Sequence, residues 1–140
     1  MSPEEWHAQA LDEALNELRN ALTVMADGIE REVEAAAEKD IMAALAMKHL
    51  PPPDDLADLT SRLITHGITL AVGVREIPPG LPSERGLAAA DTWARLTETG
   101  PKDGPLGNWS YARQLAAVSR SMLHAIRAHR CTPPAPDVAP

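Results

Sequence analysis

The sequence predicts an all-α protein, a four- or five-helix up-down bundle with a long N-terminal helix. Two observations lead to this fold class. Apolar residues recur three and four residues apart along most of the chain, and no segment alternates apolar and polar residues as a strand does. Clusters of proline and glycine at residues 51–53, 78–80 and 100–101 then divide the chain into helix-length segments. Short connections of this kind favour antiparallel neighbours.

Length and composition fit one globular domain. A chain of 140 residues is the size of a single domain, so we expect a bundle over residues 1–130 and a disordered Pro-rich tail over residues 131–140. Apolar residues make up 44% and charged residues 24%, as in ordinary soluble proteins. With three Trp, one Tyr and no Phe, the core must consist of aliphatic residues and alanine.

Several functional classes lack their sequence signature here. Cys131 is the single cysteine, which excludes an internal disulfide. The N-terminus carries no signal peptide and no apolar run is long enough to span a membrane, so we expect a cytoplasmic protein. The chain has neither a phosphate-binding glycine loop nor a nucleophile elbow. Its five histidines show no metal-ligand spacing, so we expect no metal and no cofactor.

The first helix begins with a strong signal and carries the longest apolar stripe. Ser2, Pro3 and Glu5 form a capping box with proline at the first helical position. We expect a helix over residues 3–38, with a kink or short break at Asp27–Gly28. The stripe is spaced alternately four and three residues apart, as in a helix that packs on a neighbour. It consists of Leu11, Leu15, Leu18, Leu22, Met25, Ile29 and Val33.

This helix supports the leading functional hypothesis, a non-enzymatic accessory or regulatory protein that acts by helix-mediated association. An unbroken helix over residues 3–38 would be about 54 Å long, which is long for so small a domain. We therefore predict a homodimer or a complex with a protein partner. The candidate partner-binding residues are Trp6, Leu11, Leu15, Leu18 and Leu22.

The central helix is predicted over residues 54–77, after a short helical segment at residues 39–50. Asp54 or Asp55 is expected to cap it. Gly67 and Gly73 would permit close approach of another helix or of a ligand. The predicted core stripe is Leu56, Leu59, Leu63, His66, Leu70, Val74 and Ile77, widened by Ile64, Ile68 and Ala71.

Two further helices complete the bundle. Ser83 is expected to cap the first of them, and Gly100–Pro101 to end it. Asn108 is expected to cap the last helix, which runs to Arg130. Their predicted inward-facing residues are Leu87, Ala90, Trp93, Ala94 and Leu96, then Tyr111, Leu115, Val118, Met122 and Ile126.

His66 motivates a second hypothesis, a small-molecule-binding protein or small enzyme. Imidazole can bind a ligand or transfer a proton near neutral pH, and Asp91 could orient it. The alternative is a core-edge histidine with satisfied hydrogen bonds and a solvated Asp91, and we favour it. The candidate pocket residues are Leu63, His66, Gly67, Leu70 and Trp93.

The charge is unevenly distributed. The net charge is −7, but residues 1–40 carry 11 acidic and 3 basic residues, while residues 109–140 carry 4 arginines and 1 aspartate. Arg113, Arg120, His124 and Arg127 form a stripe on the last helix. It could bind an anion or nucleic acid, but it lacks interleaved aromatic residues. We favour a solvated face that pairs with the acidic first helix.

Residues 50–126 contain four distinctive runs: LPPPDDLADLTSRL, HGITLAVGVREI followed by GLP, LAAADTWARL and YARQLAAVSRSML. In these runs the segment resembles a family of short uncharacterised helical proteins common in actinobacteria, some of them encoded near natural-product gene clusters. The family's Arg-Gly-His-Ile reads Thr65-His66-Gly67-Ile68 here, and its Cys-Asp-His cluster is replaced by Leu123, His124 and their neighbours. The resemblance implies an all-α cytoplasmic protein and no particular activity.

Overall fold

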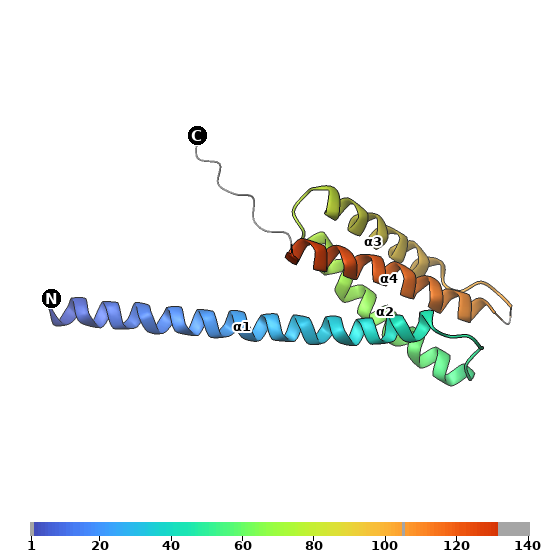
Figure 1. Cartoon of the computed structure of the whole chain (residues 1–140), viewed down its shortest axis with the longest axis horizontal. Coiled ribbons are helices and arrows are strands. Elements are labelled where there is room, and N and C mark those ends of the chain that lie inside the picture. The colour runs from blue at the N-terminus through green and yellow to red at the C-terminus, as the bar shows by residue number, and fades with distance from the viewer. Residues whose placement is uncertain (1, 105, 132–140) are drawn as a thin grey trace. The chain divides into compact units, whose positions relative to one another are not determined.

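The computed structural model describes residues 2–104 and 106–131, and these form four α-helices without a strand. The helices are α1 (Pro3–Leu45), α2 (Pro53–Arg75), α3 (Leu81–Thr99) and α4 (Gly107–Cys131). Successive helices α2, α3 and α4 run in opposite directions (Figure 1). The predicted all-α up-down bundle with a long first helix is therefore confirmed. Of the tail predicted over residues 131–140, Cys131 is the last residue of α4, and the rest lies outside the described residues.

The chain divides into two compact units, Met1–Ala35 and Ala36–Pro140. The first unit contains residues 3–35 of α1, which we call the arm. The second contains the last turns of α1 together with α2, α3 and α4. The predicted single domain over residues 1–130 stays a prediction.

Alanine and aliphatic residues form the core of the second unit. Leu63, Leu115 and Met122 are fully buried among them. Eight buried alanines let the helices approach closely, as the scarcity of aromatic residues predicts: Ala37, Ala44, Ala71, Ala89, Ala90, Ala112, Ala116 and Ala125. Gly86 adds to this, because a Cβ there would lie 2.9 Å from the side chains of Ala125 and Val74.

The residues that begin the helices agree with the prediction at α1 but not at α2 or α4. The capping box at Ser2 and Glu5 forms, with both hydrogen bonds at 3.2 Å. The predicted aspartate cap of α2 is wrong, because Pro53 occupies the first helical position and Pro52 the cap. Asn108 is likewise the second residue of α4 and not its cap. The side chain of Ser83 lies outside what the structure describes.

Helix α1 is longer and more continuous than predicted. The interruption predicted at Asp27–Gly28 does not occur, and neither does the separate helix over residues 39–50, because α1 continues to Leu45. One glycine costs only about 1 kcal/mol relative to alanine, which cooperative helix propagation on both sides of it offsets. Gly100, with φ of 73°, ends α3 as predicted.

Candidate functional site

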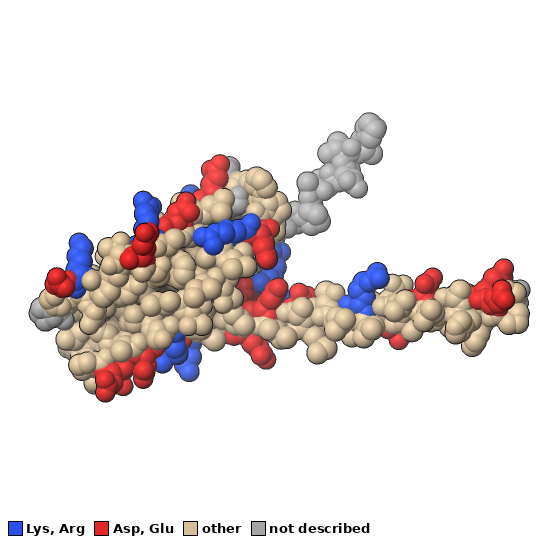
Figure 2. All heavy atoms as spheres, turned by 180° about the vertical axis from the view of Figure 1, so that it is seen from behind, with Lys and Arg blue, Asp and Glu red and all other residues tan. Residues whose placement is uncertain are grey.

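The arm presents an unusual surface: its predicted apolar stripe is exposed to solvent. Between 37% and 63% of each of these seven side chains is accessible, and we call them the apolar face: Leu11, Leu15, Leu18, Leu22, Met25, Ile29 and Val33. Isolated exposed leucines are common, but a contiguous row of seven along one helix face is typical of an interaction site. Figure 2 shows uncharged surface along much of the arm, with acidic residues at its tip.

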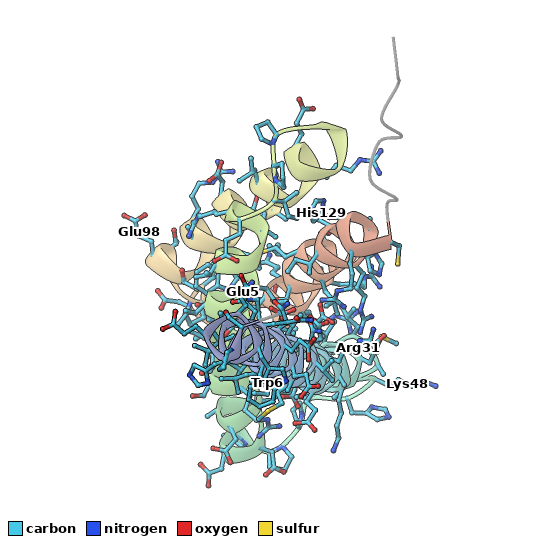
Figure 3. The ribbon with its side chains drawn as sticks, turned by 90° about the vertical axis from the view of Figure 1, so that its left-hand side faces the viewer. Glu5, Trp6, Arg31, Lys48, Glu98 and His129 are labelled. Atoms are coloured by element: carbon cyan, nitrogen blue, oxygen red, sulfur yellow. The ribbon has the colours of Figure 1, made fainter. Side chains whose placement is uncertain are left out.

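Trp6 is exposed as well, but it lies on another side of the helix. At 100° per residue, Trp6 is about 140° around the axis from Leu11. Figure 3 looks along α1 from its N-terminus and shows Trp6 and Glu5 in the first turn, with Arg31 farther along. Of the five predicted partner-binding residues, the four leucines therefore share one face and Trp6 does not.

His66 takes part in a small polar cluster within the second unit. Its Nε2–H donates a hydrogen bond of 2.7 Å to Oδ2 of Asp40, and both side chains are mostly buried. The Nε–H of Arg62 donates to the same oxygen at 3.2 Å. Asp91, the carboxylate predicted to orient His66, is exposed to solvent. The carboxylate that orients His66 is Asp40 of α1.

The sequence contains a signal that could have revealed Asp40. Ala37, Ile41 and Ala44 are buried at helical spacing, and Asp40 lies on the same face of α1. A polar residue on such a face needs a partner. The cluster satisfies this need, since one carboxylate oxygen accepts from two side chains that extend from α2. As it stands, this arrangement positions α1 against α2 and orients the imidazole ring.

The other predicted pocket residues pack against one another. Leu63 and Leu70 are buried, and the Trp93 indole lies directly against the backbone of Gly67, in the space that a Cβ would occupy. Gly67 thus permits the close approach of a neighbouring helix, one of the two roles predicted for it. The indole N–H of Trp93 is buried there without a hydrogen-bond partner among the described residues. A ligand site at these residues stays a prediction.

The arginines of α4 mostly contact the chain itself. The guanidinium of Arg113 donates to the carbonyl oxygen of Met47 at 3.1 Å and lies 5.7 Å from the centroid of the Trp109 ring. Arg127 donates to Glu38 at 3.1 Å, which confirms at this pair that α4 meets the acidic first helix. That hydrogen bond, and then the positive charge of Arg127, lower the pKa of Glu38. Arg120 and His124 are exposed.

The second unit also carries an open groove between α3 and α4, with a volume of about 930 Å³. Ala88, Ala117 and Ala125 line it, together with Ser121, His124, Glu84 and Arg85. Its walls therefore consist mainly of small side chains, with one carboxylate, one guanidinium and one imidazole among them. No group of three or more His, Cys, Asp or Glu within residues 2–104 and 106–131 is placed to hold a metal ion.

Comparison with known proteins identifies a family. Residues 35–131, more than two thirds of the chain, match a family of unknown function (DUF6415). The chain belongs to this family. The match begins where the arm ends, so it covers the bundle and leaves the arm outside. No curated protein and no solved structure matches the chain. Across the described part of the chain, no helix has the length and apolarity to cross a membrane.

Proposed function

We propose that the protein is a non-enzymatic association module that forms a homodimer through the apolar face of its arm. The observation that carries this proposal is the continuous exposure of Leu11, Leu15, Leu18 and Leu22 on one side of a helix. Contact with a partner that removes this much apolar surface from water contributes a favourable free energy of association.

The free energy gained by burying the apolar face is of the same order as the cost of association. Complete burial of a large apolar side chain contributes about 1.5–3 kcal/mol, so burying the remaining half contributes about 1 kcal/mol. Seven such side chains on each of two copies give roughly 10–20 kcal/mol. Association costs about 4–15 kcal/mol in lost freedom of motion.

Two substitutions at the centre of the apolar face test this proposal. In Leu18→Glu/Leu22→Glu, each dimer would bury four carboxylates, so the dimer should be lost at concentrations where the unsubstituted chain is dimeric. Asn20→Glu/Val24→Glu is the matched control, because it adds the same charge at the same spacing, and exposed Asn20 lies about 160° around the axis from Leu18. Val24 is 70% exposed on the same helix, but it lies about 120° around the axis from Leu18.

Light scattering coupled to gel filtration measures the outcome, and circular dichroism checks that both variants remain helical. Equal loss of dimer in the control would show that charge on the arm, and not the face, controls association. A dimer that survives Leu18→Glu/Leu22→Glu would contradict the proposal.

The proposed role in the cell rests on the sequence resemblance. The resemblance of residues 50–126 to actinobacterial proteins, some encoded near natural-product gene clusters, supports a cytoplasmic accessory role in natural-product biosynthesis. Deletion of the gene should change the yield of a secondary metabolite without abolishing any single enzymatic step. An unchanged metabolite profile would contradict this placement.

A further inference from the structure

The width of the apolar face indicates what kind of surface on a partner would cover it. At 100° per residue, the Leu18 direction is flanked on one side by Ala14, Ala21 and Gly28, and on the other by Ala8 and Ala26. Between residues 8 and 29, no charged side chain projects within about 80° of Leu18. A coiled-coil seam against a single helix is narrower than this. A face this wide fits a groove between two helices.

The α3–α4 groove has the matching shape. Ala88 of α3 and Ala117 and Ala125 of α4 leave room for larger side chains. Along α4 the groove extends from Ala117 to Ala128, about 16 Å at 1.5 Å per residue. The segment from Leu11 to Leu22 has the same length, three turns of helix. Leucine side chains projecting into an alanine-lined groove follow the usual mode of helix-in-groove recognition.

The net charges of the arm and of α4 are opposite in sign. Residues 1–35 carry nine acidic and two basic residues, whereas α4 carries four arginines and no acidic residue. Glu17 borders the apolar face on one side, about 100° from Leu18, and Arg19 and Asp12 border it on the other, about 100° and 120° from Leu18. Glu84 and Arg85 on α3 and His124 on α4 line the groove, and Arg120 is exposed on α4. An arm that paired with a second arm would instead bring together two segments with the same net charge of −7.

We infer that residues 11–22 of one copy dock into the α3–α4 groove of a second copy, and that the second arm docks reciprocally. This inference rests on the proposed homodimer and names its interface. It places the leucines against alanines and the net negative arm of one copy near Arg85 and Arg120 of the other.

A complementation experiment tests the inference in the full-length chain. Ala88→Glu/Ser121→Glu fills the groove with two carboxylates, and both positions are exposed, so the bundle should still fold. Ser110→Glu/Gln114→Glu is the matched control, with the same added charge at exposed positions of α4 outside the groove. We expect the groove variant to be monomeric and the control to dimerise as the unsubstituted chain does.

The decisive sample is an equimolar mixture of the groove variant with Leu18→Glu/Leu22→Glu. One chain then has an intact arm and the other an intact groove, so a one-to-one complex should form although each variant alone is monomeric. Raising the salt concentration should weaken it several-fold, because opposite charges attract across this interface.

The alternatives give different results. If arms pair with arms, the groove variant dimerises normally, the mixture forms no mixed complex, and added salt strengthens the dimer. That result overturns the inference and leaves the homodimer standing. A monomeric unsubstituted chain overturns both. Groove and arm variants that are both monomeric and do not complement each other also overturn the inference.

Discussion

Two helices of this protein carry leucine stripes with similar spacing and opposite surroundings. On α2, Leu56, Leu63 and Leu70 are buried in the bundle, whereas Leu11, Leu15 and Leu18 on the arm are about half exposed. Periodicity reports which side of a helix is apolar, but not what covers that side. The comparison shows that a stripe identical in pattern can stabilise the fold in one place and remain available for association in another.

The largest expected contrast comes from removing one leucine from each stripe. Leu63→Ala should lower the free energy of unfolding by about 2–5 kcal/mol, because Leu63 is fully buried and its loss leaves a cavity. Leu15→Ala should change it by about 0.5 kcal/mol or less in dilute, monomeric samples. Urea denaturation measures both. Similar losses for the two variants would show that the arm stripe is packed within the monomer.

Glycine-to-alanine substitutions should sharpen the contrast by acting with opposite signs. A Cβ at Gly67 would collide with the Trp93 indole, so Gly67→Ala should destabilise the bundle by about 1–3 kcal/mol. A Cβ at Gly28 would meet nothing within 4 Å, so Gly28→Ala should raise the helix stability of the arm by about 1 kcal/mol. Thermal unfolding followed by circular dichroism measures both shifts. Destabilisation by Gly28→Ala would indicate a close neighbour at that position in solution.

The polar cluster should contribute a smaller effect. Asp40→Asn keeps an oxygen acceptor but removes the charge that His66 and Arg62 face, and should cost about 0.5–1.5 kcal/mol. A double-mutant cycle with His66→Gln should show a coupling of at least about 0.5 kcal/mol. The cycle with Arg62→Gln should show less, because Arg62 is more exposed. Zero coupling with His66 would mean that the 2.7 Å hydrogen bond does not stabilise the fold.

The smallest effect belongs to the exposed pair of Glu38 and Arg127. Because the pKa of Glu38 is lowered from its ordinary 4.5, its ionised form stabilises the folded state above that pH. The stabilisation is lost as the pH falls below 4.5 through the folded-state pKa. Glu38→Gln should therefore reduce stability slightly at neutral pH and leave it unchanged in strong acid. Urea titrations at both pH values measure the difference, and a gap that widens in acid would contradict this sign.

Sequence periodicity predicted the helices and most of the core, because both follow from local apolar spacing. It failed at positions whose burial depends on whether another helix packs beside them: Ile68 and Leu87 were expected to be buried and are exposed. The partner of His66 could not be predicted from spacing alone, since Asp40 precedes it by 26 residues and reaches it only after α1 and α2 pack. The continuity of α1 through Gly28 was missed for another reason. The low helix propensity of one glycine does not show, by itself, whether the cooperativity of a long helix outweighs it.

The central claim, that a second copy covers the apolar face of the arm, is tested most directly by sedimentation equilibrium of the unsubstituted chain. We expect the mass to rise from 15.0 kDa toward twice that value as the concentration passes through the micromolar range. A mass that remains at 15.0 kDa at several hundred micromolar protein would contradict the claim.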